Sequence, residues 1–152
     1  MKKYEFTGET KRVELWNRTA TLHRIKATVE FGFVKVGELG GWIEKEENLS
    51  HEGKAWVCDD AKVCGNAKVC GDAEVFLASH VLVMGSVGSR NDFTTFFRDK
   101  DNEITVKCGC FLGKIDKFLE KVTQTHGNNK YALVYRAAVE VAKLQIELTE
   151  RK

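Results

Sequence analysis

The sequence lacks a run of about 18 apolar residues, the length that a helix needs to cross a membrane. Its N-terminal stretch, MKKYEFTGETKRVEL, has no apolar core, which argues against a secretory signal peptide. The formal net charge is only +2, so the chain as a whole offers no general electrostatic attraction to long nucleic acid or to a membrane. Five cysteines, an odd number without a secretion signal, indicate reduced thiols and predict a cytoplasmic location.

Motifs for the common catalytic reactions are also missing. The sequence has no HExxH zinc motif, no Walker phosphate loop and no Ser-His-Asp arrangement that can be placed in space. We therefore expect no catalytic residue, no cofactor and no metal ion. With 152 residues, of which 43% are hydrophobic and 30% charged, the chain is long enough to bury a core in one or two small domains.

The centre of the sequence contains a repeat of six residues. Written from Leu49, its rows are LSHEGK, AWVCDD, AKVCGN, AKVCGD, AEVFLA and SHVLVM, with valine recurring at the third place. A short fixed period with one apolar and one small position is typical of a β-solenoid, and Gly, Asn and Asp suit its corners. The rows predict about two coils of a left-handed hexapeptide helix.

Strands and helices are expected on either side of the repeat. HRIKATV (23–29) and FVKVG (33–37) alternate as short antiparallel strands do, and DFTTFFR (92–98) with ITVKCGCF (104–111) predicts a β-hairpin. A helix over 114–126 ends at Gly127, and a second over 129–150 begins at Asn128 or Asn129. In the second helix, Val134, Ala138, Val141 and Leu148, widened by Ala137 and Leu144, predict the face that packs on the hairpin.

Together these patterns predict a mixed α/β protein in three segments. An N-terminal β-strand cap occupies residues 1–48 and a short left-handed hexapeptide β-solenoid occupies residues 49–84. A β-hairpin and two C-terminal α-helices form a ligand-binding module over residues 85–152. The solenoid is expected to act as a spacer or as an oligomerisation surface, and a homo-oligomer is predicted.

Cysteine and histidine residues have a functional and a structural interpretation. Cys58, Cys64 and Cys70 should lie on different sides of the coil, so we interpret them as small buried residues rather than converging zinc ligands. We interpret Cys108 and Cys110 as structural thiols as well. His51 and His80 can be compared with the catalytic base of hexapeptide acyltransferases, although two coils leave little room for an acyl carrier.

The segment GSRNDFTTFFR (88–98) is the strongest candidate for a ligand site. It combines a glycine-flanked loop, arginines, hydroxyl groups and aromatic rings, which suit phosphate and base recognition. The alternative is that its phenylalanines form core, its threonines favour the strand and its arginines are solvated. The predicted ligand-binding residues are Ser89, Arg90, Asn91, Thr94, Thr95, Phe96, Phe97 and Arg98, joined by Lys107, Tyr131 and Arg136.

Two stretches resemble known phage and bacterial proteins over roughly residues 37–148. GELGGWIEKEENLSHEG followed by WVCDDAKVCGNAKVCGDAEV resembles prophage proteins in which a glycine-rich acidic lead-in opens a hexapeptide solenoid. GSRNDFTTFFR with VKCGCFLGKIDKFLEKVTQTHGNNKYALVYRAAVEVAK resembles the anti-Thoeris sponge family of phages. This resemblance implies an oligomer that sequesters cyclic ADP-ribose-type or cyclic oligonucleotide immune signals without chemistry. Lys114 departs from the small helix-capping residue expected there.

Three hypotheses follow for the function. The first is a phage-encoded protein in the cytoplasm of the bacterial host that sequesters a small nucleotide-derived signal, with no enzymatic activity. The second is a hexapeptide acyltransferase that uses His51 or His80. The third is a structural phage protein without a ligand.

Overall fold

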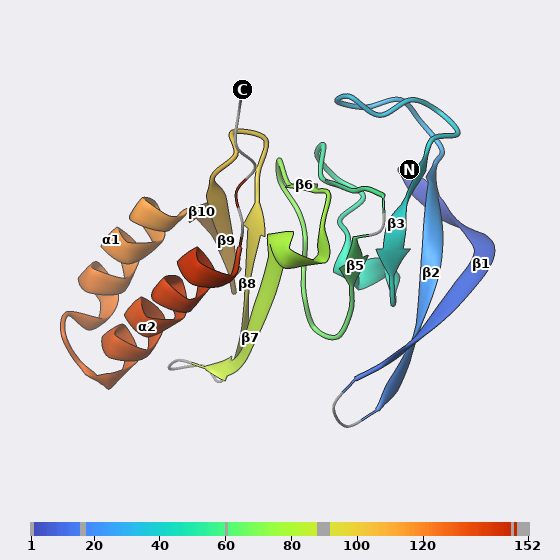
Figure 1. Cartoon of the computed structure of the whole chain (residues 1–152). Coiled ribbons are helices and arrows are strands. Elements are labelled where there is room, and N and C mark those ends of the chain that lie inside the picture. Colours follow the sequence, from blue (N-terminus) through green and yellow to red (C-terminus); the bar gives the residue numbers. More distant parts are fainter. Residues whose placement is uncertain (1, 16–17, 60, 88–91, 147, 149–152) are drawn as a thin grey trace.

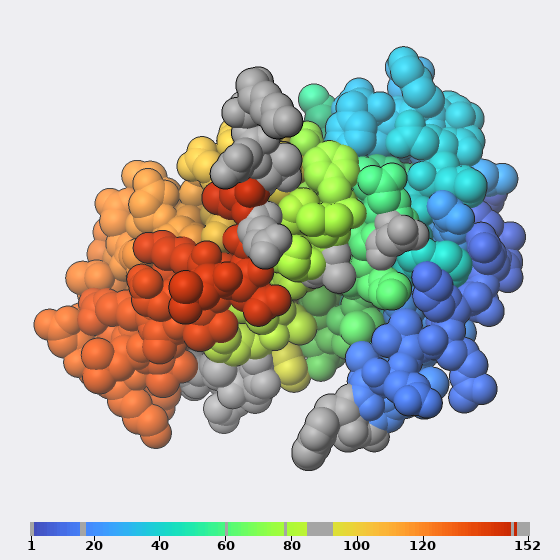
Figure 2. Space-filling view, in the orientation of Figure 1, coloured from blue at the N-terminus to red at the C-terminus, as the bar shows by residue number. Residues whose placement is uncertain are grey.

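The computed structural model describes residues 2–15, 18–59, 61–87, 92–146 and 148, which form three β-sheets and two α-helices (Figure 1). The mixed α/β class is confirmed. The helices and the N-terminal strands lie at opposite ends of the molecule, with residues of the repeat between them (Figure 2). In the described part of the chain, no helix is long and apolar enough to span a membrane.

The N-terminal sheet has the strand order β1–β2–β3–β5. Strands β1 (Tyr4–Glu14) and β2 (Thr19–Ala27) form a long antiparallel hairpin, and β3 (Leu39–Ile43) pairs antiparallel with β2. The strand predicted over 23–29 is thus present as part of β2, whose alternation buries Ile25 and Ala27. The strand predicted over 33–37 is wrong, because Phe31 and Val34 exchange two backbone hydrogen bonds across a tight turn instead.

The predicted β-solenoid over residues 49–84 is wrong. A solenoid stacks successive coils through one repeated parallel pairing. In the described residues, parallel pairing is limited to two pairings of two residues each, in different sheets, and to one isolated bridge between Leu49 and Val69. Strand β5 (Lys62–Val63) extends the N-terminal sheet, whereas β4 (Trp56–Val57) and β6 (Glu74–Val75) form a separate two-stranded sheet.

The last row of the repeat, residues 79–84, departs from the earlier rows. A short 3-10 helix at Ala78–His80 overlaps its start, and β7 (Val81–Val87) then pairs antiparallel with β8 (Asp92–Arg98). The periodic residues still serve the core, since the side chains that the repeat places inward are buried. They are Val57, Val63, Val69 and Val75 at the valine place and Ala55, Ala61, Ala67 and Ala73 at the alanine place.

Glycines let β3 approach the repeat closely. A Cβ at Gly41 would lie 2.6 Å from the Ala61 carbonyl oxygen, and one at Gly40 would lie 2.6 Å from the Trp56 ring. Behind them, Asn48 is fully buried, and its side chain joins the lead-in to the repeat. Asn48 Oδ1 accepts hydrogen bonds from the N–H groups of Glu44 and Lys45, and Nδ2 donates to the carbonyls of Gly65 and Ala67.

The C-terminal sheet has the order β10–β9–β8–β7 and is antiparallel throughout. Strand β8 and β9 (Ile104–Cys108) form the predicted hairpin, and β10 (Phe111–Lys114) follows a tight turn. Strand β8 is buried on both faces: Phe96 packs in the core under the helices, and Phe97 packs in the core formed with the repeat. The sheet is therefore the middle layer of the C-terminal half.

The two predicted helices are present as α1 (Ile115–His126) and α2 (Lys130–Gln145). Gly127 ends α1 at a φ of 61°, and Asn129 caps α2 by accepting a hydrogen bond from the Ala132 N–H. The predicted packing face of α2 is partly wrong, since Val141, Leu144 and Leu148 are exposed. The buried face consists of Ala132, Tyr135, Ala138, Val139 and Ala142.

Candidate functional site

The structure does not bring the predicted ligand-binding residues that it describes together at one site. Ser89, Arg90 and Asn91 lie outside the described residues. Tyr131 and Arg136 lie on α2, and Arg98 lies at the end of β8 beside β6. Lys107 and Thr95 lie next to each other, because they are partners in the pairing of β8 with β9.

Arg98 is committed to internal contacts and offers no free guanidinium to a ligand. It is buried, and its Nη1 donates to the Glu74 carbonyl at 3.0 Å and lies 3.5 Å from the Glu74 carboxylate. Its Nε donates to Asn102 Oδ1, and its guanidinium lies over the Phe76 ring. Arg98 therefore attaches the C-terminal sheet to the repeat rather than offering its charge to a ligand.

Four of the predicted residues of β8, namely Thr94, Thr95, Phe96 and Phe97, are also internal, whereas Phe93 is exposed. Phe96 and Phe97 are fully buried, each in a different core. Thr94 Oγ1 donates to Cys108 Sγ, and Thr95 Oγ1 accepts a hydrogen bond from the Lys68 N–H. The alternative interpretation, in which the phenylalanines form core, holds for Phe96 and Phe97.

Arg136 has a structural role in the connection between the helices. Its Nη2 donates to the Gly127 carbonyl at 2.8 Å and to Thr123 Oγ1 at 3.2 Å, and its Nη1 donates to Asn128 Oδ1 at 3.0 Å. These bonds satisfy groups at the C-terminus of α1, where carbonyls lack helical partners. Tyr131 lies nearby, with its ring 5.6 Å from the His126 ring.

Lys107 lines a groove on the face of the C-terminal sheet that lies toward the repeat. We call it the Lys68–Lys107 groove. It is a depression of about 480 Å³. A second depression of about 180 Å³ shares both lysines and also includes Thr95. The residues that line the Lys68–Lys107 groove are Glu46, Glu47, Leu49, Ser50, His51, Lys68, Val69, Cys70 and Lys107.

Two ammonium groups, of Lys68 and Lys107, and two carboxylates, of Glu46 and Glu47, line this groove. Among the described residues, no carboxylate lies within ion-pair distance of Lys68 or Lys107, and the Lys107 ammonium donates to the Gly109 carbonyl at 2.7 Å. Burial raises the pKa of the Cys70 thiol, while the charges of Lys107 and Lys68 act to lower it, so the thiol lies within the field of both lysines. Glu47 is a carboxylate at the same groove.

His51 closes one side of the groove but is not free to act as a base. Its Nδ1 accepts a hydrogen bond from the Lys3 N–H at 3.0 Å, so its Nε2 carries the proton that bonds Glu46 Oε1 at 3.0 Å. The Tyr4 ring stacks on it at 4.1 Å. The hydrogen bond from Lys2 is the largest cause that lowers the pKa of Glu46, and the bond from His51 is the next. The Glu46 carboxylate is therefore paired with both of these side chains at the groove.

His80 is buried as well, which weakens the comparison with an acyltransferase base. Its Nδ1 accepts hydrogen bonds from the N–H groups of Phe76 and Leu77. This contact closes the turn before β7 and leaves the imidazole 1% exposed. Both histidines that the sequence offered as catalytic groups therefore hold backbone segments in place.

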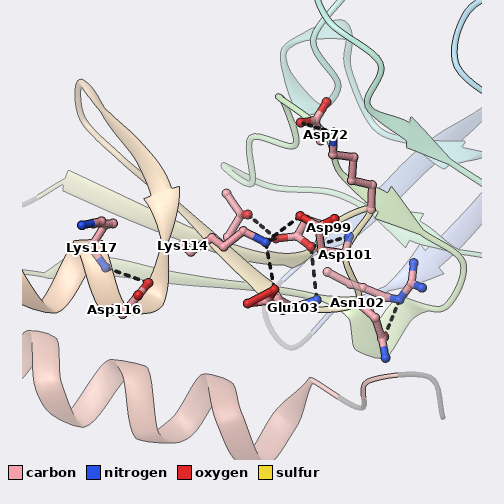
Figure 3. Close-up of polar contacts among 11 residues, drawn as sticks. Asp72, Asp99, Asp101, Asn102, Glu103, Lys114, Asp116 and Lys117 are labelled. Carbon is pink, nitrogen blue, oxygen red and sulfur yellow. Dashed lines mark hydrogen bonds and ion pairs between the residues drawn. The ribbon is translucent and has the colours of Figure 1, made fainter. Parts of the chain in front are cut away.

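Lys114 stabilises the turn between β8 and β9 (Figure 3). Its ammonium lies 2.8 Å from Asp101, 3.1 Å from Glu103 and 3.3 Å from Asp99. Burial acts to lower the pKa of Lys114, but the bonds to Asp101 and Glu103 and the charge of Asp99 raise it above its ordinary value. This explains the departure from a helix-capping residue, because Lys114 precedes α1 and bonds the acidic turn instead of capping the helix.

In the part of the chain that is described, no group of three or more His, Cys, Asp or Glu side chains is arranged so that it could hold a metal ion. All five cysteines are free thiols. Cys58 packs in the core with the repeat valines, whereas Cys64 packs beside Trp42.

Sequence reasoning missed Lys68 and Ser50 as site residues. Lys68 occupies the second place of its row, which is outward in the structure, since Lys62 and Lys68 are both exposed. A lysine at this place in two successive rows, Lys62 and Lys68, is the signal that could have directed attention there.

No protein-family model matches this chain, and a search of curated proteins finds no match either. The resemblance to the anti-Thoeris sponge family therefore stays a prediction, and any function has to be inferred from the residues of the site.

Proposed function

We propose that this protein binds and sequesters a small anionic ligand of the nucleotide type at the Lys68–Lys107 groove, without catalysis. The observation that carries the proposal is the pair of ammonium groups that no described carboxylate neutralises, on the wall of a groove of about 480 Å³. In this proposal the protein acts in the cytoplasm of a bacterial host and removes a phage-defence signal from solution. The residues Ser89, Arg90 and Asn91 remain predicted ligands.

The size and polarity of the groove suit a phosphorylated molecule. Small-molecule sites in proteins typically enclose about 300–1,000 Å³, a range that includes this volume. Lysine ammonium groups bind phosphate oxygens as point charges, and the Ser50 hydroxyl and the Asn66 amide add uncharged hydrogen-bonding groups at the groove and the depression beside it. The proposal concerns anions because no described carboxylate forms an ion pair with Lys68 or Lys107, whereas Glu46 of the same groove pairs with Lys2.

Binding without turnover fits the groups present. Proton transfer in acyl transfer needs a base with a free nitrogen, and the Nδ1 atoms of His51 and His80 both accept backbone hydrogen bonds. Cys70 is the nucleophile-type group in the groove, but burial raises its pKa and keeps it a thiol. The acyltransferase hypothesis is therefore the weaker alternative.

The test is isothermal titration calorimetry with cyclic ADP-ribose, cyclic di- and trinucleotides, inorganic pyrophosphate and acetyl-CoA. We expect one of the phosphorylated cyclic nucleotides to bind, with at least tenfold loss of affinity in Lys68→Ala and in Lys107→Ala. Lys62→Ala is the matched control, because Lys62 is an exposed lysine in the equivalent place of the preceding row. Affinity should fall as the salt concentration rises, since exposed charges are screened.

Three results would contradict the proposal. Equal affinity in Lys68→Ala, Lys107→Ala and wild type would remove the groove as the site. A chemically altered ligand recovered after incubation would indicate an enzyme. No binding by any of these probes would favour a structural protein without a ligand.

A further inference from the structure

A second cavity lies on the helix side of the C-terminal sheet, next to the turn that joins β9 and β10. It encloses about 290 Å³ and its walls come from that turn, from α1 and from α2. We call it the aromatic pocket. Its walls include Cys110, Phe111, Phe118, Thr125, His126 and Tyr135.

The walls of the aromatic pocket are rings that contact one another. The Phe118 ring lies 5.5 Å from Phe111 and 5.6 Å from Tyr135, the latter at an interplanar angle of 89°. His126 stacks against Tyr135 at 5.9 Å. The space is a depression open to solvent, since Cys110, Lys121 and Thr125 of its lining are exposed, and its volume is close to the lower end of the range typical of small-molecule sites.

The groups at the edge of the aromatic pocket select the charge of its occupant. Lys121, Thr125 and Cys110 are exposed side chains of its lining. Among the described residues, no carboxylate lines this cavity, whereas an ammonium group does. An aromatic box normally attracts cations, but the Lys121 charge opposes a cationic occupant here.

We propose that the aromatic pocket binds the uncharged, planar heteroaromatic ring of a nucleoside. Aromatic side chains take the face or edge of such a ring, and the Thr125 hydroxyl and the His126 imidazole supply hydrogen-bonding groups for its polar edge. A purine with part of its ribose fits a cavity of about 290 Å³. This site does not depend on the Lys68–Lys107 groove, because Thr95 and Phe97 face the repeat while Phe96 and Cys108 face the helices.

The test uses adenosine, inosine and cytidine, which carry no phosphate, with ribose as the non-planar control. Saturation-transfer NMR and calorimetry on the full chain should detect at least one nucleoside and no ribose. Thr125→Trp fills the aromatic pocket from an exposed position of α1, and we expect at least a tenfold loss of affinity. Gln124→Trp is the matched control, because Gln124 is exposed and lines a separate depression on α1.

A second measurement tests the proposal in the wild-type protein, without a substitution that could destabilise the fold. Alkylation of the exposed Cys110 thiol by iodoacetamide should slow at least threefold in wild type when the bound nucleoside is present, and mass spectrometry can assign the modified cysteine. The proposal is overturned if none of the three nucleosides binds, if Thr125→Trp and Gln124→Trp bind equally, or if Cys110 is not protected. Lys68→Ala should leave nucleoside binding unchanged, because Lys68 does not line the aromatic pocket, so failure of the groove does not affect this test.

Discussion

The backbone N–H of Lys68 donates a hydrogen bond of 3.0 Å to the side-chain oxygen of Thr95. This bond joins the repeat to the middle strand of the C-terminal sheet, and Thr95 pairs with Lys107 on the next strand. One threonine therefore fixes the separation of the two lysines that face the groove. A buried N–H without a partner is costly, so the bond also contributes to stability.

Replacement of Thr95 should test how much its hydrogen bond to the Lys68 N–H contributes to stability. Thr95→Val keeps the shape of the side chain but leaves the Lys68 N–H without its acceptor, so we expect a loss of about 1–3 kcal/mol in the free energy of unfolding. Urea denaturation measures it. Thr94→Val is the control on the opposite face, where the hydroxyl donates to a cysteine sulfur, a weak acceptor. A larger loss in Thr94→Val than in Thr95→Val would contradict the assignment.

Substitution of Arg136 should affect stability and leave ligand binding unchanged. Arg136→Ala removes three hydrogen bonds to the end of α1, with an expected cost of about 1–2 kcal/mol. Thermal unfolding and calorimetry on the same sample measure the two properties, and Lys143→Ala on the exposed side of α2 serves as the control. Loss of anion affinity in Arg136→Ala without loss of stability would restore Arg136 as a ligand.

The pH dependence of stability should reveal the buried Lys3. Its ammonium donates to the Ala55 carbonyl at 2.7 Å, lies over the Phe31 ring and is 3% exposed. Burial lowers the pKa of Lys3 from 10.5 to about 8, so the unfolded chain binds more protons between these values and the stability contributed by Lys3 rises with pH there.

The comparison is between wild type and Lys3→Met, because other groups that titrate in this range then cancel. The free energy of unfolding of wild type should gain about 2 kcal/mol on Lys3→Met between pH 8 and pH 10. Lys2→Met is the control, since Lys2 is an exposed neighbour whose ammonium pairs with Glu46. A constant difference between wild type and Lys3→Met over this pH range would show that the amine is not buried.

Asn48 should be the most sensitive polar position. Asn48→Ala leaves two N–H groups and two carbonyls around it without their partner, and we expect a loss of at least about 3 kcal/mol or failure to fold. Asn66→Ala, at an exposed position of the repeat, should change stability by less than about 0.5 kcal/mol. Circular dichroism of the two variants on heating is sufficient to compare them, and equal midpoints would contradict this role.

Local signals predicted the elements whose cause is local. The hairpin of β8 and β9, the end of α1 at Gly127 and the start of α2 at Asn129 each follow from turn or capping residues within a few positions. The period of the repeat correctly indicated which valines are buried, but it could not say how many rows would pair in parallel. That depends on β7, which pairs with β8 instead of extending the stack.

The candidate site was harder to predict because it depends on distant neighbours. Arg98 has the same sequence context whether it binds a ligand or the carbonyl of Glu74, and only the position of β6 decides between them. In α2, apolar residues surround much of the helix, so the period allowed a stripe through Val141 as well as the observed one through Val139. Lys68 lies at the groove only because its row of the repeat is next to Lys107 of β9, and the sequence alone does not show this neighbour.

The burial of β8 on both faces has a consequence for synthesis on the ribosome. Phe97 completes the core that contains Tyr4 and Ile25, although these residues are separated from it by most of the N-terminal half of the chain. The N-terminal strands therefore leave the ribosome long before the side chain that completes their core. Until β8 has been made, the nascent chain exposes apolar surface at the repeat, and exposed surface of this kind makes a chain prone to aggregation.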